Sequence, residues 1–156
     1  MAVKAISVVW RWIYAAWPMM VLAVYLTAHY AYPFSYYYSV GELYVDPNPA
    51  VQGDVRLVYN GGPNHAFLGK YSVIVREFTN GEIVCDASSA PFEYKLGSKR
   101  PDPLTIAWWA PSDPRCANLA PGVYSMQTCW TIVDRGWSGL LPDITECIMT
   151  PHFRVD

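Results

Sequence analysis

Four cysteines are the residues in this sequence whose type and spacing point most directly to a chemistry. They are Cys85, Cys116, Cys129 and Cys147, and they contain no C-x-x-C pair and no histidine at ligand spacing. A structural zinc site usually shows such pairs, so the pattern disfavours zinc. An even number of cysteines in an exported chain instead predicts two disulfides. If the chain is cytosolic, the alternative is four buried free thiols.

Three disulfide pairings are possible, and the expected strands favour one of them. Cys129 and Cys147 fall on the last two long apolar runs, which should form a hairpin around "DRGWSGLLPD" and so place the two cysteines opposite each other. Cys129 alternates with the apolar residues of its strand, so this bridge should lie outside the core. Cys85 then pairs with Cys116, which ties a hairpin to a following loop.

Other reactive residues form no catalytic or metal-binding pattern. The three histidines, His29, His65 and His152, lie far apart, and we interpret His29 as interfacial and the others as solvated. The acids lie singly in turns, without the dense D-x-D spacing of a calcium loop. Hydrolase, phosphate-loop and dinucleotide motifs are missing. We therefore expect no enzyme activity, no metal and no cofactor.

Tryptophans supply the most distinctive surface candidate. In "IAWWAPSDPRC", Trp108 and Trp109 are adjacent on an expected strand, so they should point to opposite faces, one into the core and one outward. We predict a binding patch for a protein or a glycan from Trp109, Arg115 and Trp137. The alternative is that the outward tryptophan only covers a sheet face or a disulfide.

The elements that must position these residues are short strands separated by turns rich in proline and glycine. We expect an antiparallel β-sandwich of about seven or eight strands over residues 37–156. Asn80-Gly81 between two β-branched runs predicts a hairpin. Strands are also expected over these ranges: 39–45, 54–60, 92–96, 104–109 and 121–133. The strand 54–60 alternates apolar Val55, Leu57 and Tyr59 with Arg56 and Val58, which predicts one buried face. The strand 121–133 should carry Tyr124, Met126, Thr128, Trp130 and Ile132 on one face. The last run, from Ile144 onward, contains Pro151, which predicts an edge or a bulge.

Residues 1–36 differ from the rest, because Arg11 is followed by an apolar run that has no acid before Glu42. A helix from Trp12 to Tyr32 would be about 31 Å long, which matches a hydrocarbon core of ~30 Å. Lys4 and Arg11 precede it, so we expect a cytoplasmic N-terminus and a periplasmic or extracellular body. The alternatives are a cleaved signal peptide, for which no clean A-x-A site is present, and a buried soluble helix.

The stretch "LAPGVYSMQTCWTIV" resembles the penultimate strand of immunoglobulin-like and fibronectin-like sandwiches. The resemblance implies that Tyr124 is a corner tyrosine with its ring in the core and its hydroxyl bonded to nearby backbone. Trp108 or Trp130 would fill the role of the core tryptophan, although neither has the expected spacing. The cysteine usual two residues after the tyrosine is Met126 here, so the resemblance implies no inter-sheet disulfide at that place. The layout is also similar to small membrane-anchored phage and bacterial envelope proteins.

These features together predict a single-pass membrane protein whose exported sandwich is a non-enzymatic interaction or adhesion module. Its partners would be the lipid bilayer, through the N-terminal helix, and another membrane or envelope protein. The net charge of −2 gives no reason to expect nucleic acid. The alternatives are a structural subunit of a larger membrane or virion-related complex, and a secreted carbohydrate-binding module released by signal cleavage.

Overall fold

A computed structural model describes residues 14, 16–27, 32–134 and 142–156. The chain divides into two compact units, Met1–Pro33 and Phe34–Asp156. The sequence predicted the boundary after residue 36, three residues later. The difference arises because Phe34 and Tyr37 are buried in the second unit, where Tyr37 packs edge to face against Phe67.

In the first unit, residues 14 and 16–27 are helical and their side chains are exposed. Within the part of the chain that the structure describes, no helix combines the length and the apolar character needed to span a membrane. The predicted span from Trp12 to Tyr32 extends past these helical residues at both ends, into residues that are not described.

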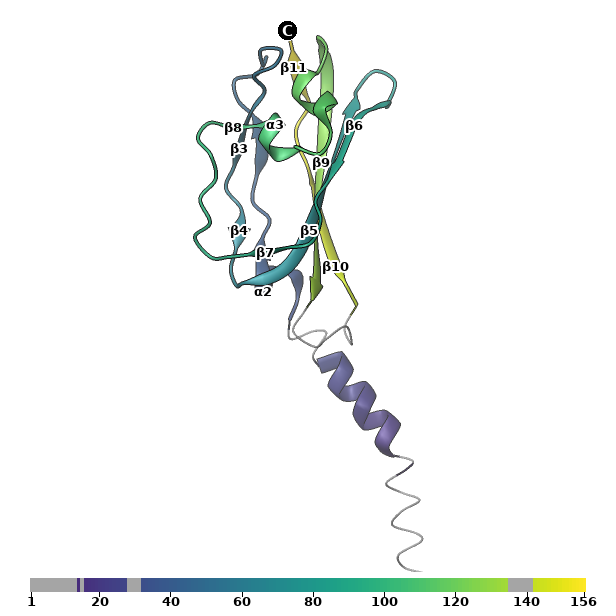
Figure 1. The fold of residues 1–156 in the computed structure, drawn as a ribbon. Coiled ribbons are helices and arrows are strands. Elements are labelled where there is room, and N and C mark those ends of the chain that lie inside the picture. The colour runs from purple at the N-terminus through teal and green to yellow at the C-terminus, as the bar shows by residue number, and fades with distance from the viewer. Residues whose placement is uncertain (1–13, 15, 28–31, 135–141) are drawn as a thin grey trace, which may run out of the picture. The chain divides into compact units, whose positions relative to one another are not determined.

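The second unit is mainly antiparallel β-structure, in which a larger and a smaller sheet form opposite sides (Figure 1). The larger sheet has the order β10-β9-β5-β6, with β11 also paired to β9 and β7 to β5. Its strands are β5 (Phe67–Glu77), β6 (Ile83–Ser88), β7 (Phe92–Tyr94), β9 (Gly122–Asp134), β10 (Ile144–Met149) and β11 (Phe153–Val155).

The opposite side is built from shorter strands. A three-stranded sheet has the order β2-β3-β8, and β1 pairs with β4. These strands are β1 (Tyr38–Ser39), β2 (Leu43–Val45), β3 (Arg56–Tyr59), β4 (Gly62–Pro63) and β8 (Leu104–Thr105). Three single helical turns complete the described elements: α2 (Phe34–Tyr37), α3 (Ile106–Trp109) and the 3-10 turn η1 (Pro114–Asn118).

Several strand predictions are confirmed. The Asn80-Gly81 hairpin joins β5 to β6, with Gly81 at a φ of 72°, where glycine avoids the strain of a side chain. On β3 the alternation holds, since Leu57 is buried while Arg56 and Val58 are exposed. The predicted apolar face of β9 is buried along its length, at Tyr124, Met126, Thr128, Trp130 and Ile132.

Tyr124 holds the chain where it enters β9. Its ring is 4% exposed, and its hydroxyl donates to the carbonyl oxygen of Ala120 at 2.7 Å. Gly122 leaves room for this arrangement, because a Cβ there would lie 3.0 Å from the tyrosine hydroxyl. The prediction of a buried ring with a hydroxyl bonded to nearby backbone is therefore confirmed.

The last predicted strand is interrupted at Pro151, as its proline indicated. Strands β10 and β11 both pair with β9, on either side of the break. Across the gap, Thr150 accepts the N–H of Met126 with its side-chain oxygen at 3.0 Å, and its own N–H donates to the Met126 carbonyl at 2.8 Å. The threonine thus satisfies the β9 backbone where proline cannot donate.

Two strand predictions are wrong in extent, and the described strands number eleven instead of seven or eight. The expected strand 39–45 is split into β1 and β2, because β1 pairs with β4 and β2 with β3. Only Leu104 and Thr105 of the range 104–109 are extended. The next four residues form α3, which Thr105 caps by accepting the N–H of Trp108 at 3.3 Å.

Both disulfides favoured from the sequence are present, Cys85–Cys116 and Cys129–Cys147. Cys129 and Cys147 face each other across β9 and β10, and Cys147 is exposed. Cys85 and Cys116 are fully buried and join β6 to η1. The Cys129–Cys147 bridge therefore lies on the outer face of the sheet, as expected, and the Cys85–Cys116 bridge lies in the core.

We predict that Tyr124→Phe lowers the free energy of unfolding by about 1–2 kcal/mol, because the Ala120 carbonyl loses its donor while the ring volume is kept. Urea denaturation of the full chain measures the change. The matched control is Tyr44→Phe, since Tyr44 is 39% exposed. Equal stability of the two variants would show that the Tyr124 hydroxyl contributes nothing.

Candidate functional site

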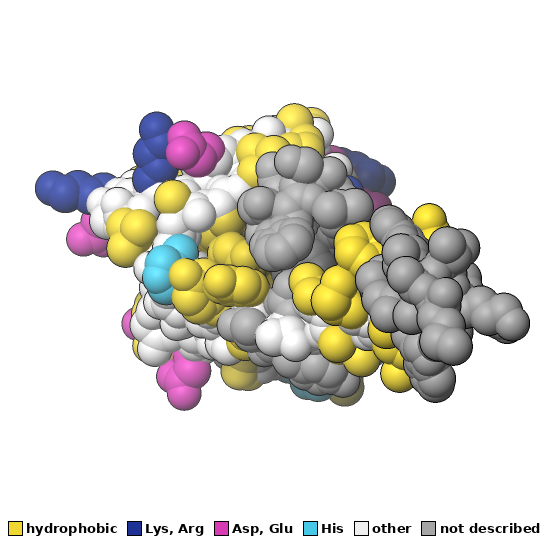
Figure 2. All heavy atoms as spheres, turned by 90° about the horizontal axis from the view of Figure 1, so that it is seen from below, with side chains coloured by type: hydrophobic (Ala, Val, Ile, Leu, Met, Phe, Trp, Pro, Cys, Tyr) yellow, Lys and Arg dark blue, Asp and Glu magenta, His cyan; other side chains and the backbone are white. Residues whose placement is uncertain are grey.

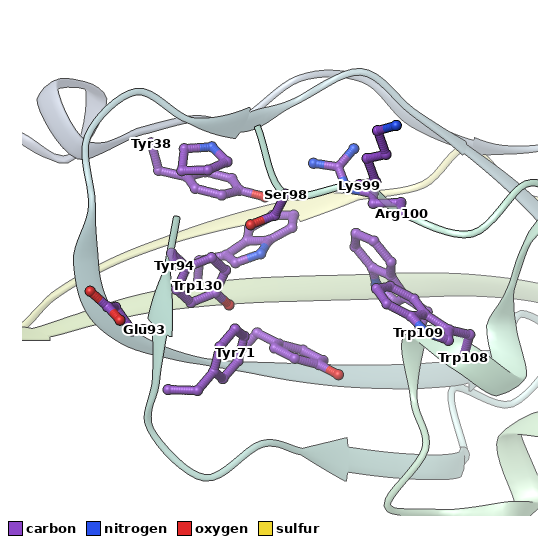
Figure 3. A pocket seen from close by; sticks show the side chains of 12 residues that line it. Tyr38, Tyr71, Glu93, Tyr94, Ser98, Lys99, Arg100, Trp108, Trp109 and Trp130 are labelled. Atoms are coloured by element: carbon purple, nitrogen blue, oxygen red, sulfur yellow. The ribbon is translucent and has the colours of Figure 1, made fainter. Parts of the chain in front are cut away.

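A cavity of about 240 Å³ opens between the two sides of the β unit (Figure 3). Aromatic rings from five elements and the loop after β7 line it. The lining residues are Tyr38, Pro63, Tyr71, Phe92, Glu93, Tyr94, Ser98, Lys99, Arg100, Trp108, Trp109 and Trp130. We call it the aromatic cavity.

Three buried rings form the inner wall of the aromatic cavity. Tyr38, Trp109 and Trp130 are each at most 5% exposed. Trp130 meets Trp109 edge to face at 6.1 Å between ring centroids, and it packs against Tyr38 at 5.2 Å. Trp109 also donates its indole N–H to Thr128 at 3.0 Å. Each ring is thus held by its neighbours, so this wall is pre-formed.

The mouth of the cavity exposes apolar surface. Trp108 is 50% exposed and Phe92 is 41% exposed. Phe92 also packs on Tyr94, with ring centroids 4.3 Å apart. Large aromatic side chains half open to solvent at a pre-formed hollow are the usual anchors of binding surfaces.

Residues 95–100 form a loop along the rim that is tied to β3 and to the segment between β3 and β4. Gly97 has a φ of 69°, and Ser98 donates to the Lys95 carbonyl through both its N–H and its hydroxyl, which closes a turn. Arg100 then donates to the carbonyls of Tyr59, at 3.1 Å, and Gly61. Its guanidinium carbon also lies 4.5 Å from the Tyr59 ring centroid, a cation–π distance.

Tyrosine hydroxyls converge on the cavity, and one of them has no partner. Tyr59 donates to the Tyr38 hydroxyl at 3.2 Å. The Tyr94 hydroxyl is buried and, among the described residues, has no hydrogen-bond partner. Burial raises the pKa of Tyr94, with the nearby Tyr38 and Tyr71 hydroxyls adding to the shift, and burial also raises the pKa of Tyr71. Both groups therefore stay protonated at neutral pH and can donate.

Charge at the mouth is predominantly positive. The acid in the lining, Glu93, pairs with Lys95 at 3.1 Å. Arg100 is bonded to neutral carbonyls, and Lys99 is exposed and has no acidic partner within the described residues. The cavity thus combines aromatic walls, an unused hydroxyl donor and two cations whose charge no described carboxylate balances.

Asp113 and the buried disulfide hold α3 and the tryptophans that it carries. The Asp113 carboxylate accepts the N–H of Asp86 at 3.0 Å and the guanidinium of Arg115 at 2.7 Å. Ser112 accepts the N–H of Ser88, so two side chains of this loop cover the outer edge of β6. Cys85–Cys116 joins the same two segments covalently. The position of Trp108 and Trp109 is therefore set by this attachment.

The predicted patch of Trp109, Arg115 and Trp137 is wrong in its central residue. Trp109 is 5% exposed and lies in the core, whereas Trp108 is the exposed member of the pair. The error follows from reading residues 106–109 as a strand. Arg115 is exposed but its guanidinium is bound to Asp113. Trp137 lies outside the described residues. The predicted core role of Trp130 agrees with its 3% exposure.

The sequence prediction missed most of the cavity. Tyr38, Tyr71, Tyr94, Lys99 and Arg100 come from segments that no spacing rule connects. One local signal did exist for Trp108, since Thr105 before the aromatic residues and Pro111 after them are typical of a short capped helix.

The histidines and acids make no metal site in the part of the chain that the structure describes, where no three His, Cys, Asp or Glu side chains form a metal-binding group. His65 stacks on Tyr36, with ring centroids 4.0 Å apart, and its Nδ1 lies 2.7 Å from the Tyr36 carbonyl oxygen. His152 packs on Phe78 at 4.1 Å. His29 is not described.

In comparisons with known proteins, the chain matches no family model, no curated protein and no solved structure.

Asp113 gives a testable pH dependence. The Arg115 guanidinium and the Asp86 N–H hold the pKa of Asp113 well below its usual range. A carboxyl whose pKa is lower in the folded state stabilises the fold above its unfolded pKa of ~3.9, and this contribution is lost as the pH falls further. We expect the Asp113→Asn variant to have a lower melting temperature than the wild type at pH 7, and we expect this difference in melting temperature to narrow below about pH 4.

Melting temperatures of both proteins between pH 7 and pH 2.5 test this expectation. Asparagine keeps one oxygen for capping η1, but its amide nitrogen replaces the oxygen that accepts the Asp86 N–H. The variant therefore removes the charge and one acceptor, and only the loss of charge makes the difference depend on pH. Glu146→Gln on the exposed face of β10 is the control and should show no such pattern. A gap that stays constant across the range would contradict the role of the carboxylate.

Proposed function

We propose that the chain is a single-pass, membrane-anchored, exported β-sandwich that acts as a non-enzymatic interaction or adhesion module. The observation that carries this proposal is the aromatic cavity, which opens at the surface beside the exposed Trp108 and Phe92. Its walls are fixed by ring packing and by a buried disulfide. A rigid apolar hollow loses little conformational entropy on binding, so it suits recognition.

An immunoglobulin-like arrangement of the sandwich is part of the proposal, and the strand order supports it. In such sandwiches strands A, B and E share one sheet, and strands C, F and G share the other. The sheet β2-β3-β8 fits the first set, and β5, β9 and β10 fit the second. Tyr124 then lies at the corner where the chain enters strand F, and its hydroxyl donates to the carbonyl oxygen four residues earlier in the chain. The disulfides depart from the immunoglobulin pattern, since neither joins β3 to β9.

The membrane anchor is supported by the first unit. Apolar side chains in residues 16–27 are exposed, including Met19 at 69% and Leu22 at 49%. Such a surface is costly in water and favourable in lipid. The β unit starts at Phe34, where the first unit ends. Figure 2 shows hydrophobic side chains at the surface, in agreement with the exposed fractions in residues 16–27.

The alternative of a carbohydrate-binding module keeps one supporting observation. Trp108 is half exposed and tyrosine hydroxyls lie in the same cavity, a combination that could stack on a sugar ring and bond to its hydroxyls. A subunit role in a larger membrane or virion-related complex would use the exposed apolar helix instead. The experiments below separate these roles.

The topology part of the proposal predicts how the cysteines react in intact cells. A membrane-impermeant thiol reagent should label nothing until an impermeant reductant is added. Cys129 and Cys147 should then react first, because Cys147 is exposed and Cys85 and Cys116 are buried. Mass spectrometry of the labelled peptides reads the order. Labelling that requires cell lysis, or that occurs without reductant, would contradict an exported, oxidised domain.

The interaction part predicts capture of a partner at the cavity. A photo-crosslinking residue at Leu96, which is 62% exposed beside the rim, should give a discrete adduct in native membranes. Trp108→Ala should reduce that adduct about tenfold or more, because truncating an aromatic anchor costs ~2 kcal/mol. Gel shift and mass spectrometry measure it.

The control places the same crosslinker at Val51, which is 64% exposed and outside the cavity lining. No adduct should form there. An adduct at Leu96 that is unchanged by Trp108→Ala would exclude the cavity as the contact. An adduct only when the crosslinker is within residues 16–27 would favour the subunit role.

A further inference from the structure

We infer that the aromatic cavity binds an aromatic ring that carries a carboxylate. The inference names a ligand class for the cavity of the proposed function. It rests on the proposed function only because both use the same cavity. Three independent features support it: the size and walls of the cavity, the unpartnered Tyr94 hydroxyl, and the positive charge at the mouth.

The size and walls of the cavity favour one planar ring. A cavity of roughly 150 Å³ suffices for benzene in an engineered protein core, and this one has about 240 Å³. It therefore has room for one ring with a short polar arm and not for a chain of sugars. In Figure 3, Tyr38 and Tyr94 lie on one side of the cavity and Trp108 and Trp109 on the other, with Trp130 and Tyr71 between them. An inserted ring would thus meet other rings at their faces or edges.

The Tyr94 hydroxyl favours a ligand that carries a hydrogen-bond acceptor. It is buried, it stays protonated, and no described group accepts its hydrogen. A buried donor without a partner is unfavourable, and native proteins rarely leave one. A ligand carboxylate would supply the missing acceptor, whereas a purely hydrocarbon ligand would leave the hydroxyl unpaired and buried deeper.

The positive charge at the mouth of the cavity favours an anionic ligand. Lys99 and Arg100 line the cavity without a described carboxylate partner, while the negative charge of Glu93 is neutralised by Lys95. A cationic ligand would be repelled by both residues, although aromatic walls alone could have held it. A neutral sugar would leave both cations unused. An aryl carboxylate would pack against the rings, accept a hydrogen bond from the Tyr94 hydroxyl and be attracted by the two cations.

The same chemistry could come from a free small molecule or from a polypeptide whose last residue is aromatic, since that residue carries a carboxylate beside its ring. The test therefore has two pairs of probes. Phenylacetate is compared with phenylacetamide, and the N-acetylated peptide acetyl-Gly-Gly-Phe is compared with its C-terminal amide. Within each pair, size and ring are matched and only the negative charge differs.

Binding to the full chain in mild detergent is followed by the side-chain NMR signals of the tryptophans. We expect the acid of at least one pair to shift the signals of Trp108 and Trp109, with an affinity about tenfold above its neutral match, as for a hydrogen bond to a charged group. Preference for phenylacetate assigns a free ligand, and preference for the peptide acid assigns a chain terminus. Neutral and acidic probes binding equally, or neither binding at millimolar concentration, would overturn the inference.

Variants separate recognition from folding. Tyr94→Phe should weaken the acid about tenfold and leave the melting temperature of the free protein unchanged or higher, because it removes an unpartnered hydroxyl. Lys99→Gln should weaken the acid and not the neutral probe, whereas the matched Lys70→Gln, whose lysine is exposed and outside the cavity lining, should do neither. If Tyr94→Phe binds the acid as tightly as the wild type, the inference fails. Because these probes need no partner protein and no membrane orientation, this failure is distinct from failure of the proposed function.

Discussion

Ring packing on Trp130 is the interaction on which the rest of the β unit depends. The indole stacks on Tyr59 of β3, with centroids 5.4 Å apart and planes 14° apart, while Trp109 approaches it edge-on. It thus joins the large sheet to the small one and to α3. Aromatic pairs add directional preference to simple burial, so the same packing that holds the sheets together also fixes the inner wall of the cavity.

The other walls are held by polar contacts that act at a distance from the cavity. Arg100 fastens the rim loop to the carbonyls of Tyr59 and Gly61. Asp113 fastens the segment after α3 to β6, and Cys85–Cys116 repeats that attachment covalently. Because each charged group is matched to backbone or to an opposite charge, the loops keep their places while the rings between them stay available to a ligand.

The groups of this cavity are rings, protonated hydroxyls and cations, which are suited to binding and orienting a ligand. This is why we propose recognition as its role. The unpartnered Tyr94 hydroxyl and the unbalanced charge of Lys99 leave both a donor and a cation unused in the free protein. The disulfide-bonded β unit presents this cavity on a cross-linked framework, and the exposed apolar side chains of the first unit are the basis of the proposed role at a membrane.

Local pattern predicted the mainly β character, the β5–β6 hairpin, the buried face of β9 and the Cys129–Cys147 pair, because period-2 alternation and turn residues act between near neighbours in the chain. The Cys85–Cys116 pair followed as the remaining one, and the Tyr124 contact followed from the resemblance to immunoglobulin-like strands. The tertiary structure decided the split of residues 39–45 between two partners, the helical turn that buries Trp109 and exposes Trp108, and the cavity itself. Those features depend on side chains such as Tyr38, Tyr94 and Trp130, which lie far apart in sequence and meet only once the two sheets pack.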